Sequence, residues 1–234
     1  MSKRLLLISN STAHGGGYLD HCEAEIRDIL SGVARIVFIP FALHDREGYA
    51  RKARERLRRM GFEVDSLHDA RDPKELVRSA EAFFVGGGNT FRLLDELCRR
   101  DLIKTIRAAV DGGAVYMGSS AGSNVACVTI KTTNDMPIVQ PPSFEALNLV
   151  PFNINPHYLD PDPSSTHMGE TRETRIREFH EMNDPIVVGL REGSMLRIEE
   201  GSVVLKGSTG ARVFRKGREA EEYPPESEMD FLLA

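Results

Sequence analysis

The sequence predicts an α/β fold with a doubly wound, mostly parallel sheet, helices on both faces and a small antiparallel C-terminal extension. Two observations predict it. As far as residue 185, short apolar runs alternate with helical patterns, which is typical of strand–helix–strand units. Beyond that residue, short runs follow one another through glycine-containing turns, as in antiparallel strands. In parallel sheets of this type sites lie beyond the carboxyl ends of the strands, so we look for functional residues there.

Each element is expected from its apolar pattern. Short apolar runs predict strands, and apolar residues three or four positions apart predict helices. A further helix is expected from Asp72, which is an N-cap residue followed by proline in the first turn. Strands are expected at residues 5–8, 34–41, 62–64, 82–85, 114–117, 186–190, 195–198, 203–205 and 212–214. Helices are expected at residues 18–30, 46–60, 90–100 and 102–110, and the acidic segment 219–230 is expected to be irregular.

The composition indicates one globular domain that spans residues 1–234. Hydrophobic residues make up 41% and charged residues 28% of the chain, which is ordinary for a globular protein. The net charge of −5 argues against a nucleic-acid partner. The apolar run at residues 5–8 is shorter than the roughly seven residues of a signal-peptide core. No run approaches the ~20 residues of a membrane span, so we expect a cytoplasmic protein without a membrane partner.

The cysteines argue against a disulfide framework. There are 3 of them, an odd number, and they lack paired spacing. This pattern predicts a reducing compartment and no zinc site. No other group of ligand residues has a suitable spacing, so neither a metal nor an organic cofactor is expected. The C-terminal edge extension is compatible with a homodimer.

The stretch Gly118-Ser119-Ser120-Ala121-Gly122 is the strongest functional signal in the chain. It follows the expected strand 114–117 and precedes small residues that can begin a helix, the context in which G-x-S-x-G indicates a nucleophile. Glycines two positions before and after the central serine remove side chains that would collide in such a sharp turn. The sequence therefore predicts Ser120 as a nucleophile at the carboxyl end of a strand.

A serine nucleophile needs a base, and the base needs an acid that orients it. His157 is the favoured base because it follows an extended run closed by proline, and His167 is the second choice. Two residues compete as the acid. Glu192 follows the expected strand 186–190, whereas Asp135 fits the chain order of serine, acid and histidine in α/β-hydrolases. We rank Glu192 first and keep Asp135 as the alternative.

An oxyanion hole requires two N–H donors near the nucleophile. One is expected from the N–H of Ala121, directly after the serine. The other is expected from the loop Gly86-Gly87-Gly88-Asn89-Thr90, where three glycines permit close approach of the backbone. Position 91 is phenylalanine and no G-K-[ST] follows, so the loop is neither a dinucleotide fingerprint nor a P-loop.

The region after the candidate base offers a residue for specificity. Arg172 lies four residues before the apolar Ile176, on the inward face of an expected helix. An arginine turned inward near a catalytic serine favours a carboxylate ligand. The alternative is a structural ion pair with Asp160 or Asp162, and we rank ligand binding ahead of it.

Five segments occur in order along the chain, at residues 85–91, 118–124, 132–137, 154–157 and 169–172. Together they resemble the peptidase E family, the α-aspartyl dipeptidases, and the likeness runs from residue 5 to beyond residue 215. The resemblance implies a serine peptidase on a fold similar to class I glutamine amidotransferases, with serine in place of their cysteine. It also implies that the partner is a small peptide substrate whose free N-terminal residue is aspartate.

The resemblance also assigns residues. It matches the family's nucleophile to Ser120, its base to His157 and its glycine-loop oxyanion donor to Gly88. The family's acid has been assigned to the positions that match both Asp135 and Glu192, so this choice stays open.

Two further matches concern substrate binding. The arginine that would pair with the substrate aspartate matches Arg172, and Asn89 is a polar partner beside it. Residues 158–168 follow the family least well, which leaves the rim of the pocket undefined.

Two other functions remain as alternatives. One is a peptidase that resembles cyanophycinase on the same scaffold and cuts a polymer rich in aspartate. The other is a non-catalytic module that binds an acidic metabolite through Arg172 and the glycine loops. An esterase of the α/β-hydrolase type fits less well, because the histidine precedes the glutamate at the strand end.

Overall fold

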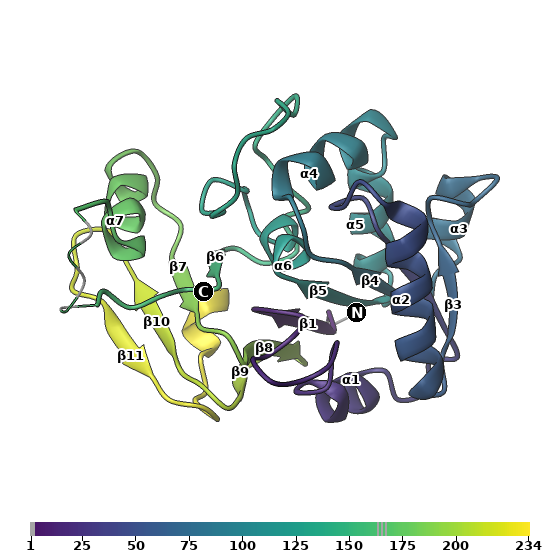
Figure 1. The fold of residues 1–234 in the computed structure, drawn as a ribbon, viewed down its shortest axis with the longest axis horizontal. Coiled ribbons are helices and arrows are strands. Elements are labelled where there is room, and N and C mark those ends of the chain that lie inside the picture. Colours follow the sequence, from purple (N-terminus) through teal and green to yellow (C-terminus); the bar gives the residue numbers. More distant parts are fainter. Residues whose placement is uncertain (1–2, 163, 165, 167) are drawn as a thin grey trace.

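The computed structural model describes residues 3–162, 164, 166 and 168–234 and arranges them around two β-sheets (Figure 1). The larger sheet has seven strands in the order β3-β2-β4-β5-β1-β8-β9, and the smaller has four in the order β11-β10-β7-β6. In Figure 1 the larger sheet and its helices form the right-hand part of the molecule, and the smaller sheet with α7 forms the left-hand part.

Five of the seven strands of the larger sheet are parallel to one another, as predicted. They are β1 (Leu5–Ile8), β2 (Arg35–Ile39), β3 (Glu63–Ser66), β4 (Ala82–Val85) and β5 (Val115–Ser119). The helices of this part are α1 (Glu23–Ile29), α2 (Arg46–Arg59), α3 (Pro73–Arg78), α4 (Thr90–Arg99), α5 (Ile103–Asp111) and α6 (Ala121–Ala126). This arrangement confirms the predicted α/β class.

The smaller sheet lies beyond this region in sequence. Its strands are β6 (Asn153–Pro156), β7 (Val187–Leu190), β10 (Ala211–Phe214) and β11 (Glu221–Tyr223), and β6 and β7 are parallel. Helix α7 (Arg172–Met182) connects β6 to β7, and a 3-10 helix, η1 (Asp230–Leu233), ends the chain.

The first strand shows why both faces of the larger sheet carry helices. All four residues of β1 have no exposed surface. Leu5 and Leu7 pack into one hydrophobic cluster, with side chains of α4 and α5, whereas Leu6 and Ile8 pack into another, with side chains of α1 and α2. Alternate side chains of a strand point to opposite faces. A strand that is apolar at every position must therefore be covered on both sides.

The C-terminal strands differ from the expected single extension. Strands β8 (Ser194–Glu199) and β9 (Ser202–Gly207) do extend the larger sheet in antiparallel fashion, beside β1. Strands β7 and β10, however, join β6 in the second sheet. Short apolar runs indicate that strands exist but carry no information about which strand each will pair with, so the division into two sheets was missed.

The start of the first helix and the structure of the acidic C-terminal segment also differ from the sequence prediction. The first helix begins at Glu23 and not at Tyr18, because Leu19 has a left-handed φ of 60° and Tyr18 pairs with Thr12 in an isolated bridge. The apolar residues that predicted the inward face of this helix, from Tyr18 to Leu30, are nevertheless buried. The segment expected to be irregular contains β11, which pairs with β10.

The cysteine thiols lie in apolar surroundings. Cys22 and Cys127 are buried, and Cys98 is half-buried. Burial disfavours the thiolate and raises the pKa of Cys22 and of Cys127 to about 12. These two side chains therefore act as small apolar residues at neutral pH.

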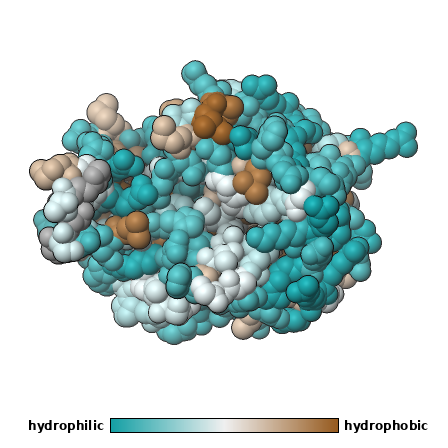
Figure 2. Space-filling view, in the orientation of Figure 1, coloured by the Kyte–Doolittle hydropathy of each residue, from teal (hydrophilic) through white to brown (hydrophobic). Residues whose placement is uncertain are grey.

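The face of the molecule drawn in Figure 2 is largely hydrophilic, and its most hydrophobic residues lie in separate small groups. Within the part of the chain that the structure describes, no helix combines the length and the apolar character needed to cross a membrane.

Candidate active site

Ser120 occupies a sharp turn between β5 and α6. Its φ of 52° and ψ of −108° are unusual for a residue with a side chain. The turn is held from both sides, because the Ser120 N–H donates to the Ile8 carbonyl at 3.0 Å and the Ser120 carbonyl accepts from the Asn124 N–H at 3.0 Å. Strained backbone of this kind persists only where its surroundings fix it.

The two flanking glycines are required by close packing. A Cβ on Gly118 would lie 2.5 Å from the Gly122 carbonyl oxygen, and a Cβ on Gly122 would lie 2.1 Å from the Val85 carbonyl oxygen. Helix α6 therefore starts directly against β4 and β5. This is the collision that the sequence pattern predicted.

Three polar side chains form a continuous hydrogen-bonded line. The Oγ of Ser120 lies 3.0 Å from Nε2 of His157, and Nδ1 of His157 lies 2.6 Å from Oε1 of Glu192. A carboxylate only accepts, so Nδ1 carries the proton and Nε2 is left to accept from the serine hydroxyl. A hydroxyl, an imidazole and a carboxylate in this order are typical of serine-type hydrolases.

The pairing of β6 with β7 brings the histidine to the glutamate. Their register places Pro156 opposite Leu190, at the carboxyl ends of two parallel strands. His157 directly follows one strand and Glu192 follows the other by two residues. Parallel strands end at the same edge of a sheet, so the two side chains meet there.

Residues after β1 connect the two sheets at this point. The Ser9 hydroxyl donates to the Leu190 carbonyl at 2.8 Å, and its oxygen accepts from the His157 N–H at 2.9 Å. Asn10 Oδ1 accepts from the Gly193 N–H at 2.8 Å. Both side chains are buried. Sequence reasoning missed them, although two polar residues directly after a buried apolar strand were a visible signal.

Asp135 has a different role from Glu192. Its Oδ2 accepts from the Thr90 N–H at 2.7 Å, from the Thr90 hydroxyl at 2.6 Å and from the Thr133 hydroxyl at 3.1 Å. A carboxylate at this position stabilises the N-terminus of α4. Among the described residues, the carboxylate on the His157 ring is that of Glu192. His167, the second candidate base, lies outside the described residues.

The glycine loop lies beside the nucleophile. A Cβ on Gly87 would be 3.2 Å from Cβ of Ser120, and Gly88 has a φ of 134°, a conformation that favours glycine. The loop is tied to the segment after β2 by a 2.9 Å hydrogen bond from the Asn89 N–H to the Ala42 carbonyl. On the other side, Ala121 is the first residue of α6, where the N–H has no acceptor four residues earlier. Of the two expected oxyanion donors, Gly88 thus lines the same cavity as Ser120, and Ala121 follows Ser120 directly in the chain.

The side chain of Asn89, predicted to bind substrate, makes two hydrogen bonds to the backbone. Its Oδ1 caps α4 by accepting from the Arg92 N–H at 3.0 Å, and its Nδ2 donates to the Met136 carbonyl at 2.8 Å. The amide therefore joins the glycine loop to the segment that carries Asp135.

Arg172 begins α7 and is half-buried in a hollow that Asn134 and Thr171 also line. Burial lowers the pKa of its guanidinium and nearby Arg175 adds to this, whereas Asp135 opposes it. Ser120 and His157 line a different cavity.

Neither alternative partner of Arg172 pairs with it. Asp160 binds Arg191 at 2.7 Å, and Asp162 accepts from the Ser164 hydroxyl at 2.7 Å. Within the described part of the chain, Arg172 makes no ion pair, whereas Arg175 pairs with Glu170 at 3.4 Å.

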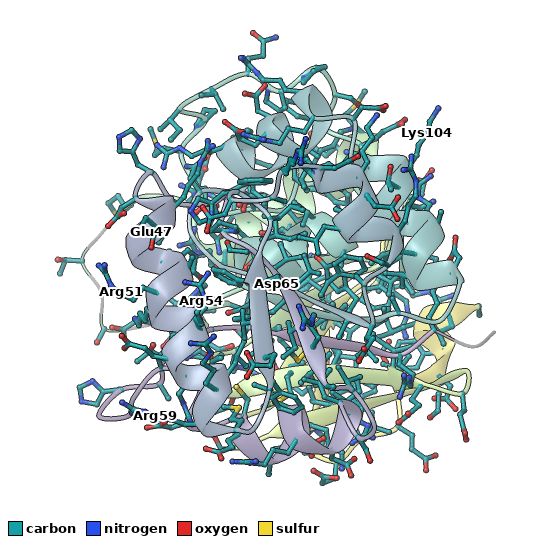
Figure 3. All side chains as sticks on the ribbon, turned by 90° about the vertical axis from the view of Figure 1, so that its right-hand side faces the viewer. Glu47, Arg51, Arg54, Arg59, Asp65 and Lys104 are labelled. Carbon is teal, nitrogen blue, oxygen red and sulfur yellow. The ribbon has the colours of Figure 1, made fainter. Side chains whose placement is uncertain are left out.

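One group of side chains among the described residues has the spacing of a metal site. Nε2 of His68 lies 3.3 Å from Glu47 and 2.9 Å from Asp69. Glu47 lies at the start of α2 on the charged face in Figure 3. None of the three lines the cavity of Ser120.

Comparison with known proteins agrees with this class of site: the chain belongs to peptidase family S51, whose family model matches residues 5–206. It is therefore a serine-type peptidase. It is 53% identical over 229 residues to peptidase E of Streptomyces coelicolor, covering 98% of this chain and 94% of that protein. It is 46% identical over 235 residues to a probable alpha-aspartyl dipeptidase of Drosophila melanogaster, covering 99% of this chain and 98% of that protein.

Solved structures support the fold. A peptidase from an acI-B1 actinobacterium superposes with a TM-score of 0.74 at 20% identity, covering 98% of this chain and 97% of that chain. A putative peptidase E protein from Listeria monocytogenes EGD-e superposes with a TM-score of 0.68 at 24% identity, covering 88% of this chain and 99% of that chain.

Proposed function

We propose that this peptidase hydrolyses dipeptides with a free N-terminal aspartate through an acyl-enzyme on Ser120. The observation that carries the proposal is the line from the Ser120 hydroxyl through His157 to Glu192, with distances of 3.0 and 2.6 Å. The names of the two relatives, peptidase E and probable alpha-aspartyl dipeptidase, support a substrate that begins with aspartate.

The first half of the reaction forms an ester. Oγ of Ser120 attacks the carbonyl carbon of the substrate aspartyl residue while Nε2 of His157 takes the hydroxyl proton. The carbonyl oxygen becomes an oxyanion between the N–H groups of Gly88 and Ala121. The C–N bond then breaks, and His157 gives its proton to the leaving amine.

The second half restores the enzyme. Water attacks the ester carbon, His157 takes its proton, and the carbon–oxygen bond to Ser120 breaks. Aspartate leaves with its new carboxylate, and the proton returns to the serine oxygen. Glu192 holds the imidazole ring in place and stabilises its cationic form in both halves.

Arg172 is the proposed partner of the aspartate side chain. It is half-buried and makes no ion pair among the described residues. The charge of Asp135 raises the pKa of its guanidinium, but less than burial lowers it. A desolvated guanidinium without a partner favours a carboxylate ligand.

Replacing the nucleophile tests the mechanism. Ser120→Ala is expected to abolish release of aspartate from Asp-Leu, because no other group can form the ester. The measurement is amine release over time, with circular dichroism to show that the variant is folded. A folded variant that retains a substantial fraction of the parent's kcat would place the nucleophile elsewhere.

The two candidate acids are expected to give different defects. Glu192→Gln should lower kcat by roughly a hundredfold. This loss is smaller than that expected for a buried triad acid, because the Glu192 side chain is half exposed to water. Asp135→Asn should instead lower the free energy of unfolding by about 1–3 kcal/mol, because it replaces a charged acceptor of three hydrogen bonds with a neutral amide. Steady-state kinetics and thermal denaturation of both variants check this. A larger kcat loss in Asp135→Asn would reverse the assignment.

The specificity residue is tested with paired substrates. Arg172→Met should reduce kcat/KM for Asp-Leu by about tenfold to a hundredfold, the cost of losing a charged hydrogen bond. The same variant should change kcat/KM for Asn-Leu much less, because that side chain carries no charge. Equal effects on both substrates would argue against contact with the aspartate side chain. Arg177→Met, which removes a half-exposed arginine of α7 that pairs with Glu173 and Glu219, is the matched control.

A further inference from the structure

The cavity beside Ser120 extends from the catalytic residues to helix α2. Its volume is about 470 Å³, within the usual range for small-ligand sites. Ser120, His157 and Gly88 line one part of it, and Lys52 and Tyr18 line another. A dipeptide bound at the nucleophile therefore has room to extend towards α2.

Lys52 is the cation available to a ligand in this cavity. Asp45, which also lines it, already caps α2 by accepting from the Gly48 N–H at 2.9 Å. Two acidic residues near the start of α1, Asp20 and Glu23, pair with Arg56 at 2.9 and 2.6 Å. Across residues 3–162, 164, 166 and 168–234, no carboxylate forms an ion pair with Lys52.

Aromatic packing fixes where the Lys52 ammonium lies. Nζ sits 4.4 Å from the centre of the Tyr18 ring, a cation–π contact. Tyr18 is itself only 9% exposed and packs edge-on against Tyr49, which in turn packs against Phe38. The ring is therefore a rigid support. The contact orients the ammonium while leaving N–H donors free for a ligand.

A dipeptide that begins with aspartate carries two carboxylates, one on the side chain and one at the C-terminus. Among the described residues, neither Arg172 nor Lys52 forms an ion pair with a carboxylate, and the two side chains line separate hollows. The hollow of Arg172 is also lined by Arg175 and by the acidic residues Asp160, Asp162 and Glu170, whereas the hollow of Lys52 contains Ser120 itself. One side chain cannot reach both cations at once.

We propose that Lys52 binds the free C-terminal carboxylate of the residue that leaves, and so selects dipeptides over longer peptides. The proposal rests on the function proposed above and adds a second charge contact to it. In a longer peptide this position holds an uncharged amide, which gives the ammonium no ion-pair partner. Lys52 is thus a specificity residue that touches substrate far from the bond that breaks.

The test compares a free acid with its amide. The parent enzyme should cleave Asp-Leu with a higher kcat/KM than Asp-Leu-amide. Lys52→Met keeps the aliphatic stem on Tyr18 but removes the charge. It should lower kcat/KM for Asp-Leu by about tenfold to a hundredfold, mainly through KM, and change the value for the amide by no more than about twofold. Lys52→Arg should recover part of the loss, since it restores a positive charge.

A neighbouring basic residue supplies the control. Arg51 precedes Lys52 on α2 and is exposed as Lys52 is, but it does not line the cavity and projects from the charged face seen in Figure 3. Arg51→Met removes the same charge and should leave both substrates unaffected. A similar loss in Arg51→Met would show that net charge alone, through steering, accounts for the effect.

Binding to an inactive enzyme separates this proposal from the catalytic one. In the Ser120→Ala background, calorimetry should show weaker binding of Asp-Leu when Lys52 is replaced by Met, and unchanged binding of Asp-Leu-amide. Equal losses for acid and amide, or no loss for the acid, would overturn the role of Lys52 while leaving hydrolysis at Ser120 intact. Failure of the parent enzyme to cleave Asp-Leu would instead overturn the proposed function, and the binding comparison would still decide the carboxylate contact.

Discussion

The site depends on the docking of the smaller sheet against the carboxyl ends of the larger one. Ser120 ends a strand of the larger sheet, whereas His157 and Glu192 follow strands of the smaller sheet. The hydroxyl of Ser9 spans this junction, with one hydrogen bond to each strand end of the smaller sheet. A shift of about 1 Å between the sheets would break the 3.0 Å contact between hydroxyl and imidazole. Catalysis therefore requires the sheet junction to be rigid.

Much of this arrangement could be predicted from sequence because it is encoded locally. A nucleophile in a tight turn needs glycines at fixed positions, and Gly118 and Gly122 make contacts that permit no side chain. The buried strand at residues 5–8 and the helix that Asp72 caps, with proline in its first turn, also follow from neighbouring residues. His157 and Glu192 were proposed because each follows the end of an expected strand. In the structure Nδ1 of His157 lies 2.6 Å from Oε1 of Glu192.

What sequence could not supply was contact between distant segments. The position of Asp135 in the chain fits an acid of the triad, yet its carboxylate is taken by Thr90, 45 residues earlier. The two-sheet division depends on pairing of β6 with β7, in which Pro156 lies opposite Leu190, 34 positions later in the chain. Lys52 lies on a helix rich in arginine, and nothing in its local pattern separates it from its solvated neighbours. Its significance comes from a cavity wall that only the folded chain defines.

The most direct test of the central claim is to locate the covalent adduct that a fluorophosphonate forms with the enzyme. Such a reagent reacts with a serine that a neighbouring base activates, and peptide mass spectrometry identifies the modified residue. We expect one phosphonylated serine, Ser120, and we expect this labelling to be lost when His157 is replaced by alanine. Modification of a different serine, or an active enzyme in which Ser120 stays unlabelled, would contradict it.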